Sequence, residues 1–326
     1  MANLRTRAWA LFDRIVAAAP LRDANPWRRE DDGRARFEPD YDTLRQLLGV
    51  PAYLHATSQS GVPALALDVW VSYELRRAGF DPDAIWPRPV APRVLPQEIT
   101  KFVAALPVKQ RALLEERISV RGAGGSTSAN ILGKNYVKQV DVVMSAWATG
   151  PELMISTKRM DSSFGKNAAN RVEESYGDAK NLRLRHPQAA LGFFYGLGAG
   201  ALETEPEIAR WLIDLLGKLG READAYDAVG LVILDAEGTF SDSTAEEDPA
   251  GPLEAGSVEP MATDPGEGDE GDDTELVRLP RVTLNRGEVP PELDPGRFLG
   301  IMCNLVLDRT PINFHREARA RRHAAD

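Results

Sequence analysis

Two short segments decide the fold, Val137-Lys-Gln-Val-Asp-Val-Val-Met144 and Glu152-Leu-Met-Ile-Ser-Thr-Lys158. Both are rich in β-branched residues, and Pro151 marks the start of the second, so the pattern predicts two successive strands. Apolar residues with helical spacing follow over residues 167–185, and residues 189–197 form a continuous apolar run typical of a strand inside a sheet. The order strand, strand, helix, strand predicts an α/β fold with a mixed sheet flanked by helices.

The residues before these strands have a mainly helical pattern. Helical spacing predicts helices over residues 4–16, from Tyr41 onward, over residues 64–78, from about Gln97 onward, and over residues 109–118. Gly79 is the expected stop of the third helix. The proline-dense residues 86–93 should be extended and mark a boundary. We therefore separate a mainly helical N-terminal region, residues 1–92, from a core of residues 93–240.

The C-terminal part contains a segment of unusual composition. Its regular elements are a predicted helix over residues 206–219, a strand over 229–234, a strand near 277–284 and a helix over 295–307. Residues 241–275 carry 13 Asp and Glu residues and no Lys or Arg. Because this segment has little apolar surface to bury, we expect a disordered acidic insertion. Residues 276–326, with a basic tail, should pack on the core.

Composition points to a globular protein whose acidity is local. The net charge is -10, but the chain outside residues 241–275 has 39 basic and 36 acidic residues. Residues 101–186 have 14 basic and 8 acidic residues, which weakly favours a polyanionic partner. The single cysteine, Cys303, lies in an apolar run and fits a reducing cytoplasm. We find no signal peptide and no segment of membrane-spanning length, so we expect a cytoplasmic protein without membrane contact.

The two predicted strands carry the groups of a metal site. Asp141 lies among valines, which is unfavourable for a carboxylate unless a metal ion or a cation holds it. Lys158 ends the next strand, and side-chain alternation places Glu152, Ser156 and Lys158 on one face. Glu152 either supports the lysine from behind or lies exposed at the strand start. An aspartate beside a strand that ends in a lysine forms the skeleton of a two-strand metal site.

These residues resemble the PD-(D/E)xK nuclease superfamily, which includes many restriction endonucleases. Its pattern is an Asp on one strand, an acid two residues before a Lys on the next strand, and then a helix and another strand. Asp141 and Lys158 match this pattern, whereas Ser156 stands in place of the middle acid. The resemblance implies a restriction-endonuclease-like sheet in residues 93–240.

One branch of this superfamily, which cuts CCGG-type sites, also has Ser or Cys at the middle position. There the acid comes from a Glu on the following helix, and Glu173 and Glu174 lie in that window here. With 100° per residue around a buried face centred on Val172, Glu173 lies at its flank and Glu174 near the solvent side. We therefore predict Glu173 as the migrated acid.

The resemblance implies hydrolysis of DNA phosphodiester bonds with Mg²⁺. Asp141, Glu173 and the Thr157 carbonyl would be the metal ligands, which are hard oxygen donors. Lys158 would orient the attacking water and stabilise the transition state, with Ser156 beside it. Five residues are expected to contact DNA, since their side chains pair with base edges or phosphates: Arg159, Lys166, Asn167, Asn170 and Arg171. Ordinary helix capping by Ser162 or Ser163 is the alternative for this region.

The sequence thus predicts a type II restriction-like endonuclease. Its expected partners are double-stranded DNA, a second copy in a homodimer and a cognate DNA methyltransferase, with residues 1–92 serving DNA recognition or dimerisation. One alternative is a non-catalytic DNA-binding or scaffold protein that keeps the nuclease fold. Another is a phosphate-binding or nucleotide-binding enzyme that uses the glycine-rich loop at residues 122–128.

Overall fold

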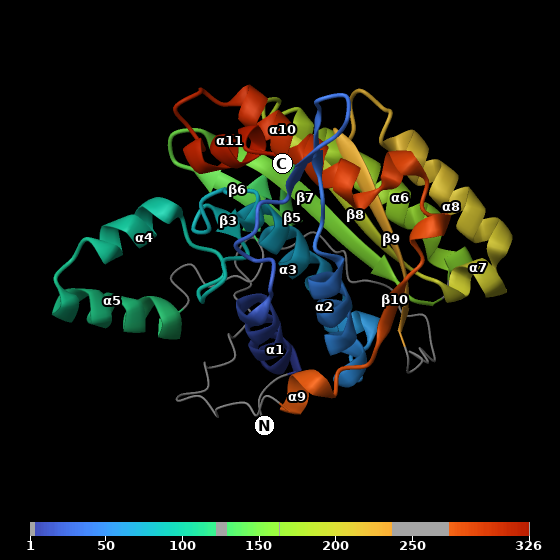
Figure 1. Ribbon diagram of the computed structural model, residues 1–326, viewed down its shortest axis with the longest axis horizontal. Helices are drawn as coiled ribbons and strands as arrows, with labels where there is room; N and C mark the ends of the chain where they lie inside the picture. Colours follow the sequence, from blue (N-terminus) through green and yellow to red (C-terminus); the bar gives the residue numbers. More distant parts are fainter. Residues whose placement is uncertain (1–3, 122–128, 163, 237–273, 326) are drawn as a thin grey trace.

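The computed structural model describes residues 4–121, 129–162, 164–236 and 274–325. A six-stranded sheet lies at its centre, with helices on both sides (Figure 1). The strands are, in spatial order, β10 (Val282–Leu284), β9 (Ala228–Ala236), β8 (Ala190–Gly198), β7 (Gly150–Met160), β6 (Val142–Ala146) and β3 (Ile85–Trp86). The strands β7, β8 and β9 are parallel, whereas β6 and β10 run antiparallel to their neighbours. The predicted mixed α/β class is confirmed.

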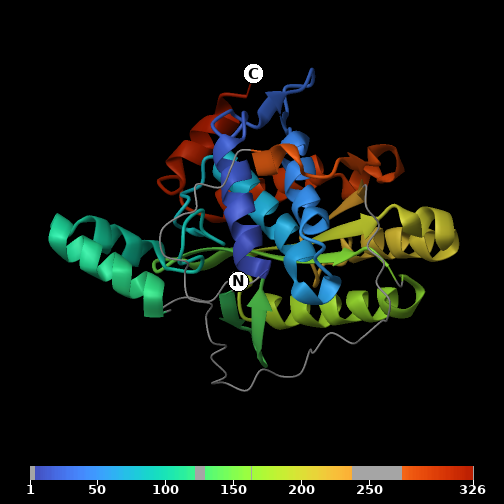
Figure 2. The ribbon, with the colours of Figure 1, turned by 90° about the horizontal axis from the view of Figure 1, so that it is seen from below.

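Two apolar clusters lie on the two faces of the sheet. One contains residues of α1 (Leu4–Ala18), α2 (Tyr41–Tyr53), α3 (Val62–Arg77) and α10 (Pro295–Arg309). The other contains residues of α6 (Phe164–Arg183) and α8 (Pro206–Leu219). Figure 2 shows α1 and α2 on one side of the sheet and α6 on the other. Along β7, Leu153 and Ile155 enter the first cluster and Met154 the second, as strand alternation requires.

The helix α3 is central because it lies between the sheet and the other N-terminal helices. Trp70 packs against Phe194 of β8, with ring centroids 5.5 Å apart. Gly79 ends the helical segment with a φ of 93°, as the sequence predicts. A Cβ at Gly79 would lie 2.9 Å from the backbone nitrogen of Ala318, so a side chain here would also push the C-terminal segment away. The N-terminal helices and the C-terminal helices therefore share one core.

The segment predicted as one strand over residues 137–144 is divided at Asp141. Its first half, β5 (Val137–Val140), pairs with β4 (Ala129–Leu132) in a separate two-stranded ribbon. Its second half, β6, joins the main sheet. Asp141 therefore lies at the junction of two sheets, outside both ladders. Local propensity predicts an extended chain at these residues, but the choice of partner strand depends on tertiary contacts.

Several short elements were not evident in the sequence. The polar loop after Trp27 forms a hairpin of β1 (Trp27–Arg29) and β2 (Ala35–Phe37), and the basic tail forms α11 (Arg316–His323). Residues 241–273 of the predicted acidic insertion lie outside the described residues, whereas Thr274–Val277 form α9. The remaining elements are α4 (Gln97–Ala104), α5 (Val108–Arg121), α7 (Gly200–Thr204) and 3-10 turns at Ser58–Ser60, Arg286–Glu288 and Pro291–Leu293.

The structure also bears on the single cysteine and on membrane-spanning segments. Cys303 is a free, buried thiol on α10, as its apolar neighbours predict, and burial raises its pKa above the ordinary value. Within the part of the chain that the structure describes, no helix combines the length and the apolar character needed to cross a bilayer.

Candidate active site

Thr157 holds two carboxylates from distant parts of the chain. Its backbone N–H donates a hydrogen bond of 2.8 Å to Oδ2 of Asp141. Its hydroxyl donates a hydrogen bond to Oδ1 of Asp68, which lies on α3. Asp68 is buried, with 8% of its surface exposed, and Asp141 is partly buried. The predicted aspartate on the first strand therefore has a second acid beside it, supplied by the N-terminal helices.

Both carboxylates are held in an environment that disfavours their charge. Burial raises the pKa of Asp68 well above its usual range, and the negative charge of Asp141 raises it further. Burial also raises the pKa of Asp141, against the opposing effects of the Lys158 ammonium and the Thr157 N–H. Two acids that share a buried site cannot both ionise freely unless a cation or a proton accompanies them. Perturbed carboxyl pairs of this kind are characteristic of functional sites.

Lys158 follows Thr157 directly and adds a positive charge. It is partly exposed and lies on the other face of β7, on the side of α6. Its charge favours the ionised forms of Asp141 and Asp68, and so does the charge of Arg5 on α1. Among the described residues, no hydrogen bond or ion pair fixes the Lys158 ammonium. The lysine is therefore near the acids without being neutralised by either of them through a direct bond.

The donor set fits a hard divalent cation. Mg²⁺ prefers oxygen ligands, and it commonly takes one or two carboxylates together with water and phosphate oxygens. Asp68 and Asp141 supply the carboxylates. In a regular strand the N–H and the C=O of one residue point toward the same neighbour, so the Thr157 carbonyl points to the same side as its N–H, toward Asp141. Groups of three or more His, Cys, Asp or Glu side chains suited to a metal do not occur among the described residues.

Glu173 lies on α6, the helix that follows β7. Glu173 and Glu174 are both exposed on α6, whereas their neighbours Val172 and Ser175 face the core. No hydrogen bond or ion pair within the described residues links Glu173 to the acids or to Lys158. The second carboxylate that the structure places beside Asp141 is Asp68.

Ser156, which stands at the place of the middle acid, is enclosed on the side of α6. It is 8% exposed, and its hydroxyl hydrogen-bonds the phenol of Tyr226. The Tyr226 hydroxyl in turn donates to the Ser175 carbonyl at 2.9 Å. Ser156 shares the α6 face of β7 with Lys158, but its hydroxyl is bound to the Tyr226 phenol and makes no hydrogen bond with either acid in the described part of the chain. Ser156 therefore has the surroundings of a structural residue.

The residues predicted to contact DNA have different surroundings. The side chain of Arg159 is 1% exposed, and its Nε lies 2.9 Å from Oδ2 of Asp161, so its guanidinium compensates a charge inside the protein and does not face outward. Asn170 is exposed on α6. The backbones of Lys166, Asn167 and Arg171 belong to α6, but their side chains lie outside the described part. Ser163 and the glycine-rich loop at residues 122–128 lie outside it as well.

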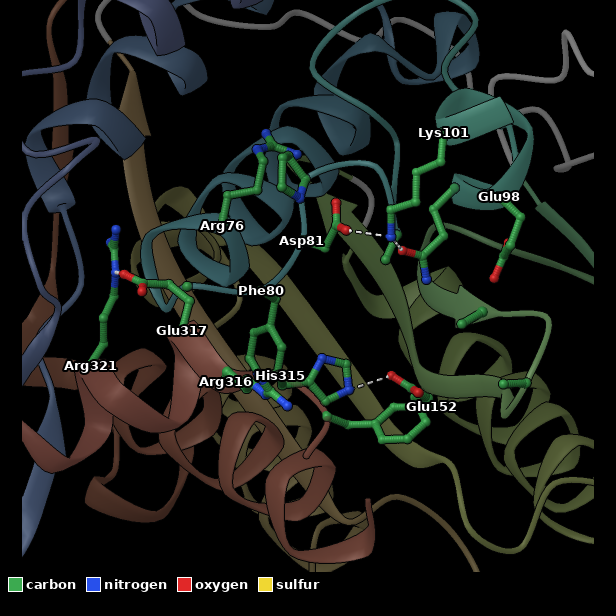
Figure 3. Close-up of a pocket in the computed structure, with 17 residues that line it drawn as sticks. Arg76, Phe80, Asp81, Glu98, Lys101, Glu152, His315, Arg316, Glu317 and Arg321 are labelled. Atoms are coloured by element: carbon green, nitrogen blue, oxygen red, sulfur yellow. Dashed lines mark hydrogen bonds and ion pairs between the residues drawn. The ribbon is translucent and has the colours of Figure 1, made fainter. Parts of the chain in front are cut away.

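Glu152 lies in a second polar site at the other end of β7. It is buried, it accepts a hydrogen bond of 2.6 Å from the Thr149 hydroxyl, and its Oε2 lies 2.9 Å from Nε2 of His315 (Figure 3). His315 has a φ of 51° and packs edge-on against Phe80, with ring centroids 5.2 Å apart. The cavity beside this pair has a volume of about 650 Å³. Glu152 is thus neither exposed nor a support for Lys158, because a C-terminal residue covers it.

The sequence carries a signal for Asp68 that its local pattern alone does not connect with Asp141. Asp68 lies in Ala64-Leu-Ala-Leu-Asp-Val-Trp-Val71, where a carboxylate among apolar side chains is as unfavourable as Asp141 among valines. The same physical argument therefore applied to both residues.

Comparisons with known proteins assign no family to the chain. No protein-family model matches it, and neither a curated protein nor a solved structure matches it.

Proposed function

We propose that this protein is a divalent-metal-dependent deoxyribonuclease of the restriction-endonuclease type, which hydrolyses phosphodiester bonds of double-stranded DNA. The observation that carries the proposal is the pair of carboxylates, Asp68 and Asp141, joined through Thr157 beside an ammonium group. A buried carboxylate beside a second carboxylate is costly to the fold, so a function that requires both charges explains why they are there.

The order of the elements also supports the proposal. Asp141 directly precedes β6, which is antiparallel to β7, and Lys158 lies near the end of β7. The helix α6 and the parallel strand β8 follow. This is the arrangement that the resemblance to the PD-(D/E)xK nucleases implies. The proposed site differs from the resemblance in one respect. Its second acid, Asp68, comes from α3, whereas the resemblance implies an acid from α6.

The residues have separate roles in the proposed reaction. Asp68 and Asp141 would hold Mg²⁺ together with the Thr157 carbonyl, and the bound ion would lower the pKa of water and screen the phosphate charge. Thr157 fixes the orientation of both carboxylates through two hydrogen bonds. Lys158 would orient the attacking water and stabilise negative charge that develops on the phosphate oxygens. Arg5 adds positive charge near the same acids.

The proposal includes two macromolecular partners. A cut through both strands needs two active sites, and a two-fold symmetric homodimer would present them to the two strands of a palindromic site. A cognate DNA methyltransferase would protect host DNA from such an enzyme. Plasmid DNA is therefore tested in both its methylated and its unmethylated form.

Cleavage of supercoiled plasmid DNA tests the proposal. We expect the wild type to cut it in the presence of Mg²⁺ or Mn²⁺ and not with a chelator, and we expect Asp141→Ala and Lys158→Ala to abolish cutting. Asp214→Asn, which changes an exposed acid on α8 that pairs with Lys218, is the matched control and should cut normally. If the wild type cuts neither methylated nor unmethylated DNA with either ion, the non-catalytic DNA-binding alternative is favoured instead.

A further inference from the structure

The ribbon formed by β4 and β5 has two different faces. Its inner face packs on the core through Ala129 and Val140, which are buried in the cluster beneath α6. The cross-strand pairs Asn130 with Gln139 and Leu132 with Val137 form the other face, and all four residues are exposed. Leu132 is 47% and Val137 53% exposed. The outer face of the ribbon therefore presents two amides and two apolar side chains side by side.

The ribbon is held rigidly against α6. The Asn181 side chain accepts a hydrogen bond of 2.8 Å from the Asn135 N–H and donates one of 3.0 Å to the Tyr136 carbonyl. The Lys138 ammonium lies 2.5 Å from a carboxylate oxygen of Asp178. A Cβ at Gly133 would lie 2.1 Å from the Asn181 amide, so the turn fits tightly against the helix. The outer face is therefore presented in one fixed orientation.

The charge of the ribbon differs from that of the whole chain. Residues 129–140 contain two lysines and no Asp or Glu, in a chain whose net charge is -10. Lys134 and Asn135 are exposed at the tip, beside Tyr136, which is 45% exposed. Because Lys138 is paired with Asp178 of α6, the ribbon offers a polyanion the charge of Lys134 at its tip.

The position of the ribbon links it to the active site. The strand β5 ends at Val140, directly before Asp141, so the ribbon has a fixed place relative to the carboxylates. In Figure 2 the ribbon, in green, lies on the same side of the main sheet as α6. Lys158 also points to that side. A DNA duplex that reaches Lys158 with one phosphate would meet the ribbon with neighbouring base pairs.

We propose that the outer face of the β4–β5 ribbon reads base edges in the major groove of DNA, with Asn130 and Gln139 as the specificity-determining residues. The major groove admits a two-stranded ribbon, and Asn and Gln pair bidentately with adenine. Leu132 and Val137 offer apolar contacts for the thymine methyl group, and Lys134 reaches a phosphate. The ribbon thus selects a site that contains an A·T pair. This inference rests on the proposed function for the identity of the polyanion as DNA.

The test compares four full-length proteins: the wild type, Asn130→Ala, Gln139→Ala and the control Asn313→Ala, an exposed amide before α11. One arm sequences the ends of DNA cut in Mg²⁺. The other selects bound duplexes from a random-sequence DNA library in a chelator, so that binding is read without cleavage. We expect Asn130→Ala and Gln139→Ala to weaken the preference for an A·T pair at one position by about 10- to 100-fold, and the control to keep it.

Lys134→Ala provides an independent measurement. It should weaken binding to all sequences equally and reduce the slope of the logarithm of affinity against the logarithm of salt concentration by about one, as loss of one phosphate contact does.

The outcomes separate the inference from the proposed function. If the wild type cuts DNA and all variants share one sequence motif, or if the wild type selects no motif, the inference is overturned. If no protein cuts DNA but the library selection still changes with Asn130→Ala and Gln139→Ala, the ribbon reads DNA and the nuclease proposal fails. Stronger selection of RNA duplexes than of DNA duplexes would also overturn the inference.

Discussion

The helix α3 carries two buried acids, Asp68 and Glu74, whose surroundings are opposite. Glu74 is fully enclosed, its Oε2 lies 2.6 Å from the Arg77 guanidinium, and its Oε1 accepts a hydrogen bond of 2.7 Å from the Asp40 N–H. Asp68 has a hydroxyl donor but faces a second carboxylate, that of Asp141. The charge of Glu74 is thus balanced by Arg77, whereas the charge of Asp68 is disfavoured by Asp141. A carboxylate held beside a second carboxylate, more than burial itself, indicates a functional site.

The pKa directions follow this difference. Burial raises the pKa of Glu74 to about 7, and the attraction of Arg77 limits the rise. Burial raises the pKa of Asp68 as well, but there the charge of Asp141 increases the shift. The neighbouring Asp40 shows a third case, because hydrogen bonds from Thr43 and Tyr73 outweigh its burial and lower its pKa.

The largest expected effect concerns Glu74, whose charge Arg77 balances. Arg77→Met removes the cation of Glu74 and leaves a buried carboxylate unpaired, so the free energy of unfolding should fall by about 3–5 kcal/mol. Chemical denaturation measures this, and Arg45→Met, which breaks an exposed pair with Asp42, should cost less than about 1 kcal/mol. Equal effects of the two substitutions would contradict the special cost of leaving Glu74 unpaired.

The next effect concerns Asp68, which lies beside the carboxylate of Asp141. Asp68→Asn removes a proposed metal ligand, so cleavage should fall by about 100-fold or more, since even outer groups around a metal contribute 10- to 100-fold. The fold should become no less stable, because a like charge is removed from the site. Plasmid cleavage and urea denaturation measure the two sides. Wild-type cleavage by Asp68→Asn would show that the acid pair is not the active site.

The pH dependence of stability sharpens the same contrast. A carboxyl whose pKa is raised on folding binds more protons in the folded protein, so the fold loses stability as pH rises from the unfolded pKa, 3.8 for Asp, through the raised value. Without divalent ions, Asp68→Asn should therefore gain stability relative to the wild type between about pH 5 and about pH 8. An unchanged difference between the two proteins at the two pH values would contradict the raised pKa of Asp68.

The smallest effect concerns the serine at the place of the middle acid. Ser156→Ala removes a buried hydrogen bond to Tyr226, so the free energy of unfolding should fall by about 1 kcal/mol. Cleavage by the folded protein should stay near the wild-type rate, because the Ser156 hydroxyl is bound to Tyr226 and has no role in the proposed reaction. A loss of activity as large as that of Asp68→Asn would place the metal on the side of α6.

Local patterns were sufficient for most elements, and they indicated Asp141 and Lys158 as candidate site residues. Helical spacing predicted α8 with its bounds, and the β-rich pattern predicted extended chain on either side of Asp141 and at Lys158. Asp68 could not be placed, because it lies 89 residues before Thr157 and no local pattern shows where α3 packs. The division of a strand at Asp141 and the cover of Glu152 by His315 have the same origin. Each depends on a partner that is distant in the sequence.

Binding of Mn²⁺ to the full-length protein, followed by electron paramagnetic resonance, tests the central claim that Asp68 and Asp141 together hold the cation. We expect a site in the wild type that is lost in Asp68→Asn and in Asp141→Asn and retained in Glu173→Gln and in the control Asp214→Asn. Retention of the site in Asp68→Asn together with its loss in Glu173→Gln would contradict the account and would move the second ligand to α6.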